Sequence, residues 1–239
     1  MKLNNRLNIM HVLFAKRCLL CGSVSERDLC PPCHDSLPHL SSHHCMVCAL
    51  PLATASVCGA CLANPPAFER SIAAASYAFP IDALLHSLKY EAKLALAPVL
   101  ADLLTVRISP ADLPDFILAM PLHPAKLRER GFNQALEIAR GVSKTTGVEL
   151  LPLACRRVRD TRSQTGLPWK EREKNIRGAF TCEADLSGRR IAIVDDVMTT
   201  GATLNELAKV LRERGACNVS AWVVARTLPD RLAQAHSES

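Results

Sequence analysis

No part of this 239-residue sequence approaches the roughly 18 to 20 uninterrupted apolar residues of a membrane-spanning helix. The apolar stretch at residues 72–79, for example, stops at Pro80 and Asp82. The first 17 residues contain two lysines and two arginines but neither a long apolar centre nor a small-residue cleavage site, which argues against a secretion signal. We therefore expect a cytoplasmic protein with no membrane span, in which residues 1–17 form a short amphipathic helix.

Aromatic residues make up only 4% of the chain, which argues against a long stacking track for single-stranded nucleic acid. A Gly-x-x-x-x-Gly-Lys segment is also missing, so Walker-type nucleotide binding is not expected. Hydrophobic residues account for 49% and charged residues for 22%. This composition excludes disorder over most of the chain and allows one full core with a small second domain.

Cysteine, in contrast, is abundant: eight of the eleven cysteines form four Cys-x-x-Cys pairs within residues 18–61. Without an export signal, thiolate metal sites in a reduced compartment are favoured over a disulfide framework. Two such pairs complete a closed tetrahedral shell, so four pairs predict two structural Zn2+ ions, with iron-sulfur clusters as a weaker alternative. The predicted ligands are Cys18, Cys21, Cys30, Cys33, Cys45, Cys48, Cys58 and Cys61.

The order in which these pairs combine is open. Sequential pairing gives a double zinc ribbon, which we favour, whereas alternating pairing gives a cross-braced unit. The module has only about 45 residues and few large apolar side chains, so it needs metal to fold. Closed all-thiolate shells leave no position for a substrate, and we therefore assign the module to stability and partner recognition.

Composition changes abruptly at residues 64–66, which predicts a zinc-ribbon domain at 18–64 and a second domain at 67–239. From residue 115 onward, apolar runs alternate with helical patterns, which predicts an α/β fold with a parallel sheet. Strands are expected at 71–79, 116–120, 148–153, 190–194 and 219–225. Helices are expected at 81–88, 94–106, 125–146 with an interruption near 130–131, and 202–214. The polar stretch 156–175 is predicted to be a long loop.

The most specific segment is residues 191–203, in which a buried strand ends in Asp195 and Asp196 and a Thr-Thr-Gly-Ala-Thr turn opens a helix. Parallel sheets bind ligands at the carboxyl ends of their strands, and the first amides of a helix suit an anion. The turn is therefore predicted to hold a phosphate, and the two carboxylates to accept hydrogen bonds from ribose hydroxyls. The alternative is an ordinary turn in which Asp196 and Thr199 cap the helix. The turn consists of Thr199, Thr200, Gly201, Ala202 and Thr203.

This segment resembles the 5-phosphoribosyl-1-pyrophosphate (PRPP) motif of the type I phosphoribosyltransferases. The resemblance implies the fold of those enzymes, PRPP bound with Mg2+, contacts of Asp195 and Asp196 with the ribose, and contacts of the turn with the 5-phosphate. Further motifs follow in an order similar to that of the ComF family of competence-related proteins, over essentially the whole chain. That family implies an amino-terminal zinc module and, in bacteria, a role in the uptake or use of external DNA. The motifs are Leu88-Lys89-Tyr90, residues 120–124, residues 128–134, Gln164, Arg172, Asn175 and residues 178–180.

The resemblance adds two candidate ligand contacts. In related transferases the loop after the first core strand touches pyrophosphate, which makes His123 a candidate, although a lone histidine is more often structural. Arg172 lies in a stretch placed like the flexible hood loop of those enzymes. We expect Arg172 to neutralise charge and to act in catalysis with Asp195 and Asp196.

The net charge of +6 arises in residues 123–180, which hold 13 Lys and Arg against 6 Asp and Glu. Such a surplus suits a phosphate-rich partner or is simply a solvated surface. Within this region, Arg128, Arg130 and Asn133 form either a positive wall beside the phosphates or a helix face. Trp169 either stacks on a base or packs within its loop.

Three functions are compatible with these features. The first is an active phosphoribosyltransferase, a glycosyltransferase that passes the pentosyl group of Mg2+-bound PRPP to a nitrogen nucleophile. The second is a catalytically silent PRPP sensor. The third is an adaptor that binds single-stranded or double-stranded DNA and works with DNA-uptake or recombination proteins. No motif identifies an acceptor pocket, so the sequence leaves open whether the protein is an enzyme.

Overall fold

The structure, a computed structural model, describes residues 16–160 and 176–229. Its contacts divide the chain into two compact units, Met1–Leu37 and Pro38–Ser239, which are described separately. This division differs from the composition boundary at 64–66, and it puts the second set of four cysteines in the same unit as the sheet. The helix expected at 1–17 lies almost entirely outside the described residues. Within the described part, no helix is long and apolar enough to cross a membrane.

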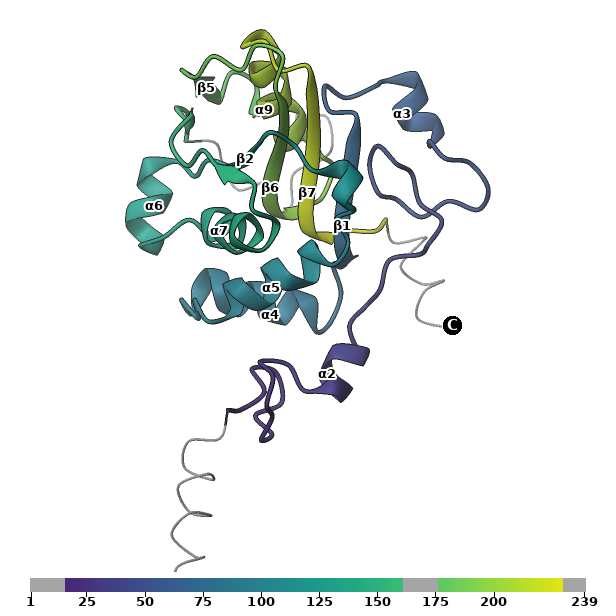
Figure 1. The fold of residues 1–239 in the computed structure, drawn as a ribbon, viewed down its shortest axis with the longest axis vertical. Coiled ribbons are helices and arrows are strands. Elements are labelled where there is room, and N and C mark those ends of the chain that lie inside the picture. Colours follow the sequence, from purple (N-terminus) through teal and green to yellow (C-terminus); the bar gives the residue numbers. More distant parts are fainter. Residues whose placement is uncertain (1–15, 161–175, 230–239) are drawn as a thin grey trace, which may run out of the picture. The chain divides into compact units, whose positions relative to one another are not determined.

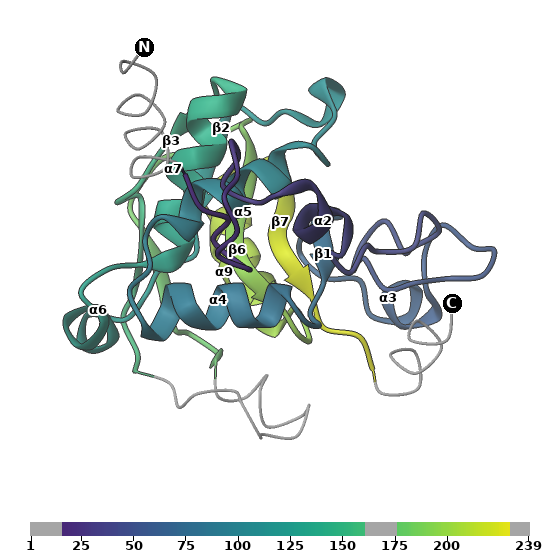
Figure 2. The same ribbon diagram turned by 90° about the horizontal axis from the view of Figure 1, so that it is seen from below.

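Five of the described strands form a parallel sheet in the order β1-β7-β6-β2-β3 (Figure 1, and Figure 2 for β3). All four neighbouring pairs run parallel, which confirms the predicted fold class. Near-continuous burial along the two central strands, β6 and β7, is typical of a sheet covered on both faces. The strands are β1 (Arg70–Ser76), β2 (Phe116–Ala119), β3 (Glu149–Leu150), β6 (Arg190–Met198) and β7 (Asn218–Arg226).

Helices cover both faces of this sheet because its right-handed crossovers run in opposite directions. The connection from β2 leads outward to β3, whereas the connection from β6 leads to β7 on the other side. Helix α7 packs on β2 and β6 and lies beside α5 (Figure 2), and α9 contacts β6 and β7. The principal helices of the second unit are α4 (Ile81–Tyr90), α5 (Leu96–Thr105), α6 (Pro124–Arg130), α7 (Gln134–Thr146) and α9 (Ala202–Glu213).

Helix boundaries follow local signals in the sequence. In α4 the buried positions are those whose spacing predicts a single apolar face, namely Ile81, Leu84, Leu85 and Leu88. The interruption expected near 130–131 separates α6 from α7, because Gly131 adopts the left-handed conformation with a φ of 83° and ends α6. Gly147 ends α7 in the same way, with a φ of 74°.

The stretch expected to be one long loop begins with a strand. Strand β4 (Cys155–Arg157) pairs antiparallel with β5 (Phe180–Cys182), so residues 156 and 157 belong to a short hairpin-like sheet. Three-residue strands are too short for alternation of burial to be recognised in a sequence, which explains why neither strand is predicted. Residues 161–175, which include Arg172 and Trp169, lie outside the described residues.

Only two charged side chains are fully buried among the residues that the structure describes. They are Asp196 and Arg226, each 4% exposed. Asp196 lies near the carboxyl end of β6, and Arg226 is the last residue of β7. Because a buried charge is costly unless it is paired or fully hydrogen-bonded, both residues need an explanation at this edge of the sheet.

Candidate functional site

The strand order locates the site. Connections leave β2 and β6 in opposite directions, and open parallel sheets bind ligands in the crevice at such a switch point, outside the carboxyl ends of the strands. The loop after β2 carries His123, and the turn of residues 199–203 follows β6. The Met120 N–H donates to the Val194 carbonyl at 2.8 Å, which joins the start of the first loop to β6. Because residues 199–203 are predicted from the sequence to hold a phosphate, we call them the phosphate turn.

The two acids at the end of β6 have different surroundings. Strand hydrogen bonding continues past them to Met198, and the two neighbouring carboxyl groups interact with each other. Asp196 forms an ion pair with Lys89 of α4. Asp195 is half-buried, and its Oδ1 accepts a hydrogen bond from the Asp196 N–H at 2.9 Å. The structure therefore separates a buried, paired carboxylate from a more accessible one.

Electrostatics distinguishes the two acids further. Burial opposes the charge of Asp196, but the Lys89 ammonium outweighs it and lowers the pKa of Asp196. Burial likewise opposes the charge of Lys89, and the Asp196 carboxylate outweighs it and raises the pKa of Lys89. Burial and the adjacent negative charge of Asp196 raise the pKa of Asp195 well above its usual value. Asp195 therefore takes up a proton more readily than Asp196 and can both donate to and accept from a hydroxyl group.

Lys89 is a residue of the candidate site that the sequence analysis did not select. Its position is contained in the Leu88-Lys89-Tyr90 motif, and helical periodicity marks Leu88 as a core residue. Periodicity gives no information about a partner more than 100 positions away in the chain, so the pairing with Asp196 becomes visible only in the fold.

The phosphate turn has a backbone that only glycine adopts easily at its centre. Gly201 has a φ of 80° and is the N-cap of α9, and a Cβ there would lie 2.8 Å from Met198 Cε. The Thr200 hydroxyl accepts a hydrogen bond from the Ala202 N–H at 3.2 Å. Neither Asp196 nor Thr199 caps the helix, so the helix-cap interpretation of these two residues is wrong.

His123 and Asn133 shape the loop that follows β2. His123 is the N-cap of α6, and its Nδ1 accepts a hydrogen bond from the Ala125 N–H at 3.3 Å. The same nitrogen lies 3.7 Å from Asp160 Oδ1, so the ring stands between the start of α6 and a carboxylate. The Asn133 side chain donates to the Met120 carbonyl at 3.0 Å and so holds the loop from the start of α7.

The arginines near this loop occupy two kinds of position. Arg130 lies 5.5 Å from the centre of the Tyr90 ring, and Arg157 lies 5.7 Å from the centre of the Phe180 ring, so both are stacked on aromatic faces. Arg128 and Arg156 are exposed. Burial lowers the pKa of Arg157, and the negative charge of Asp195 acts in the opposite direction, which indicates that Arg157 lies close enough to sense the acidic pair.

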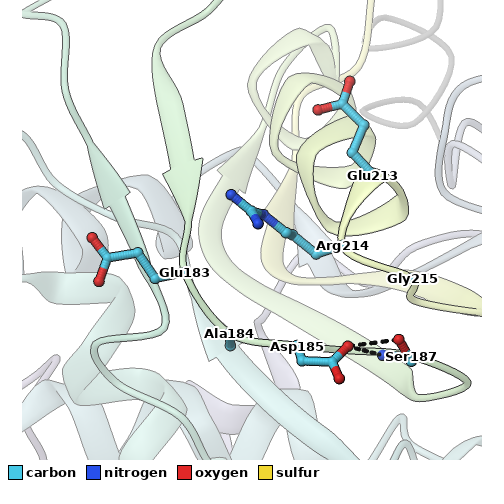
Figure 3. A pocket seen from close by; sticks show the side chains of 7 residues that line it. All are labelled: Glu183, Ala184, Asp185, Ser187, Glu213, Arg214 and Gly215. Carbon is cyan, nitrogen blue, oxygen red and sulfur yellow. Dashed lines mark hydrogen bonds between the residues drawn. The ribbon is translucent and has the colours of Figure 1, made fainter.

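A cavity of about 380 Å³ lies at the opposite end of the sheet, next to the segments that lead into β6 and β7 (Figure 3). Asp185 in its wall accepts hydrogen bonds from the Ser187 amide at 3.0 Å and from the Ser187 hydroxyl at 2.6 Å. Three acids and one arginine line this cavity, so its charge disfavours phosphate. The lining residues are Glu183, Ala184, Asp185, Ser187, Glu213, Arg214 and Gly215.

The eight paired cysteines form two separate clusters in sequential order. Cluster 1 is Cys18, Cys21, Cys30 and Cys33, and cluster 2 is Cys45, Cys48, Cys58 and Cys61. Within each cluster the sulfurs lie within 4.8 Å of one another. This grouping agrees with the favoured double-ribbon arrangement and not with the cross-braced one.

The cluster geometry fits tetrahedral zinc. A Zn–S distance of about 2.3 Å separates tetrahedral sulfurs by about 3.8 Å, whereas a disulfide would bring them to about 2.05 Å. The Cys21 and Cys30 sulfurs are 3.7 Å apart, as are those of Cys48 and Cys58. Burial opposes ionisation of the first cysteine in each cluster, but backbone N–H groups outweigh it and lower the pKa of Cys18 to about 6 and that of Cys45 to about 7.

Comparison with known proteins finds relatives for both the cysteine-rich part and the sheet-containing part of the chain. The double zinc ribbon domain family matches residues 9–62, and the phosphoribosyl transferase domain family matches residues 130–237. The DNA utilization protein YhgH of Shigella flexneri is 35% identical over 219 residues, which cover 88% of this chain and 90% of that protein. Competence protein F of Haemophilus influenzae is 31% identical over 226 residues, which cover 89% of this chain and 98% of that protein. A solved purine phosphoribosyltransferase from Pyrococcus horikoshii Ot3 is 20% identical and covers 65% of this chain and 77% of its own, with a TM-score of 0.31.

The parallel sheet and the two matched domains define a phosphoribosyltransferase-fold protein that carries a double zinc ribbon. Identity above 30% over most of the chain goes further than the fold. The chain belongs to the ComF family, together with YhgH and Competence protein F.

Proposed function

We propose that this protein binds PRPP with Mg2+ in the crevice between the carboxyl ends of β2 and β6. The observation that carries the proposal is the junction, at the switch point of the sheet, between the acidic end of β6 and a glycine-centred turn that opens α9. In this proposal the phosphate turn holds the 5-phosphate, and Asp195 contacts the ribose hydroxyls. Lys89 keeps Asp196 ionised and fixes the end of β6.

His123 and Arg172 are proposed to receive the pyrophosphate group. His123 follows β2, next to the acidic strand, and its ring is held at the start of α6 by the Ala125 N–H. Mg2+ prefers hard oxygen ligands and keeps several waters, so it would enter with the pyrophosphate oxygens and compensate their charge. Turnover would break the bond between ribose C1 and the pyrophosphate oxygen, which leaves with the electron pair, and would form a bond from C1 to a nitrogen acceptor.

The second proposed function is DNA handling in a reducing cytoplasm, with the PRPP site acting in the same process. Exposed Arg128, Arg156 and Arg159 supply a positive surface within the region of surplus charge. The names of the relatives, which refer to DNA utilization and competence, support this direction. The thiolate clusters suit a compartment that keeps cysteines reduced and loaded with two Zn2+ ions.

Titration calorimetry with PRPP and Mg2+ tests the binding site. Asp195→Asn removes a charge-assisted contact at nearly constant size and is expected to weaken binding by about 1.5 to 3 kcal/mol, or roughly ten- to hundredfold. Asp185→Asn is the matched control at the acidic cavity on the opposite end of the sheet, and its affinity is expected to equal that of the wild type. Equal affinity of Asp195→Asn and wild type, or no binding by the zinc-loaded wild type, would contradict the proposal.

Changing both Asp195 and Asp196 to Asn is expected to weaken PRPP binding by roughly a hundredfold or more. Because the second change also leaves Lys89 without its counter-ion, thermal melting of the double variant has to accompany the titration. A screen of pyrophosphate release against nucleobases, amines and DNA ends then separates an enzyme from a silent sensor. Release that depends on one acceptor identifies a transferase, and binding without release identifies a sensor.

A further inference from the structure

Arg226 is the buried charge that the phosphoribosyl site leaves unexplained. Its Nε and Nη1 atoms donate to backbone carbonyls, and among the described residues no carboxylate forms an ion pair with it. The two N–H groups of Nη1 are shared among Met198 O at 3.0 Å, Thr227 O at 2.7 Å and Thr199 O, and the Nε–H donates to Cys48 O at 2.7 Å. Carbonyls from three segments of the chain therefore converge on one rigid, planar group.

Two of these segments have a role in the site or in a cluster. Met198 ends β6, and Thr199 is the first residue of the phosphate turn. Cys48 belongs to cluster 2. The Arg226 side chain thus joins the backbone of a cysteine cluster directly to the backbone of the turn, across 178 and 27 positions of sequence.

Cluster 2 has further attachments to the same sheet. The Ser71 N–H of edge strand β1 donates to Met46 O at 2.9 Å, and the Ser71 hydroxyl donates to Val47 O. Both acceptors lie between the first two cysteines of the cluster. The cluster therefore covers part of the free edge of β1 and is held on two neighbouring strands, β1 through Ser71 and β7 through Arg226.

We propose that Arg226 is a positioning residue that makes zinc-loaded cluster 2 a structural part of the phosphate turn. Four thiolates around one Zn2+ carry a net charge of −2, which attracts the guanidinium and helps offset the cost of burying it. The planar guanidinium of Arg226 then fixes the distance between the Cys48 carbonyl and the start of the turn. Identification of the turn as a phosphate site rests on the proposed function, but the coupling of cluster to turn does not.

The consequence is an asymmetry between the clusters. Loss of zinc from cluster 2 frees the Cys48 backbone, so Arg226 loses one fixed acceptor and the turn loses part of its support. Cluster 1 belongs to the separate unit Met1–Leu37, and its loss is expected to leave the turn unchanged.

Hydrogen exchange of the amides in residues 199–203, measured on zinc-loaded protein without ligand, tests the coupling. Arg226→Lys keeps the charge, but a single ammonium group cannot bind the Cys48 carbonyl and the Thr199 carbonyl together in the same way. We therefore expect hydrogen exchange of the turn amides to become at least about tenfold faster. Arg212→Lys is the matched control, because Arg212 also donates to backbone carbonyls, those of Ala67 and Ala216, outside the turn. Exchange in the turn of Arg226→Lys equal to that of Arg212→Lys would overturn the proposal.

A second pair of variants keeps the proposal testable if Arg226→Lys fails to fold. Cys58→Ser, which opens cluster 2, is expected to speed exchange in the turn, and Cys33→Ser, which opens cluster 1, is not. Equal effects of the two variants on the turn would contradict the coupling.

Ligand affinity separates positioning from a general structural role. Arg226→Lys is expected to weaken ribose 5-phosphate binding by about tenfold and to leave pyrophosphate binding unchanged, because only the former needs the turn. An equal loss of affinity for ribose 5-phosphate and for pyrophosphate would indicate a general structural role of Arg226 and overturn the positioning role. If wild type binds neither ligand, the proposed function fails, and the exchange measurement still decides the coupling.

Discussion

The two cysteine clusters share one local design. In each, a backbone amide of the second cysteine pair lies within hydrogen-bonding distance of the first cysteine sulfur, at 3.4 Å in cluster 1 and 3.3 Å in cluster 2. In each, a short helix begins directly after the third cysteine, α2 (Pro31–Asp35) in cluster 1 and α3 (Gly59–Ala63) in cluster 2. The clusters differ in their surroundings, because the first lies in Met1–Leu37 and the second in the unit that contains the sheet.

From this difference we infer that the role of each cluster depends on the part of the chain against which it packs. Cluster 1 is held by hydrogen bonds within its own segment, such as those from Cys18 N–H to Ser23 O and from Leu19 N–H to Asp28 O, both 2.8 Å. Cluster 2 exchanges hydrogen bonds with β1 and β7 and, through Arg226, with the phosphate turn. We therefore expect the second cluster to support the sheet and its site, and the first to be free for partner recognition.

The largest expected effect comes from removing one ligand of each cluster in turn. Both Cys33→Ser and Cys58→Ser are expected to lower the zinc content from two ions per chain to one, as measured by elemental analysis. Only Cys58→Ser is expected to destabilise the sheet unit, by about 5 kcal/mol or more, because structural zinc contributes directly to folding. A similar drop in the main melting temperature of both variants would contradict the distinction between the clusters.

A somewhat smaller loss of stability is expected from a substitution in the sheet unit that lies outside cluster 2. Lys89→Met leaves the buried Asp196 without its partner and should cost about 3 to 5 kcal/mol of unfolding free energy. The zinc content is expected to stay at two ions per chain, because Lys89 does not touch a cluster. Loss of a zinc ion in Lys89→Met would show that the metal content reports general stability and not the specific contacts of cluster 2.

The pH dependence of stability provides a third test within the sheet unit. Because the pKa of Asp195 is raised in the folded state, its contribution to stability is fully present below the unfolded pKa of about 3.9 and is lost as the pH rises through the folded value. The neutral side chain of Asp195→Asn does not ionise, so this variant does not lose stability as the pH rises. At pH 7 its main melting temperature is expected to be several degrees above that of wild type, with no difference near pH 4. A constant difference at both pH values would contradict this assignment.

The smallest expected effect concerns DNA. Arg156→Ala and Arg159→Ala are each expected to weaken binding about threefold on every sequence and to lower the salt slope by about one. Arg157 is a poor choice for this test, because it is stacked on the Phe180 ring. Repeating the titration in Cys33→Ser shows whether cluster 1 adds to the same surface. Affinity that does not change between low and physiological salt would contradict a charge-driven interface.

Local patterns predicted most of the fold, whereas long-range contacts that set the site were beyond them. Apolar periodicity is a property of neighbouring residues, so it located the central strands and the buried face of α4. Lys89 with Asp196 and Arg226 with Cys48 are pairs distant in sequence, and no local signal marks them. Cysteine spacing predicted two four-cysteine sets, but not that one of them packs on the sheet.

Zinc release from the wild-type protein tests the central claim most directly. If cluster 2 supports the phosphate turn, a ligand on the turn must in return stabilise zinc in cluster 2, because coupling between two sites is reciprocal. A chelator is titrated into zinc-loaded protein with and without PRPP and Mg2+, and the zinc retained by each cluster is measured at equilibrium. We expect PRPP to raise the zinc affinity of one cluster per chain, cluster 2, and to leave that of the other unchanged. Equal zinc affinities with and without bound PRPP, or an equal rise for both clusters, would contradict the coupling.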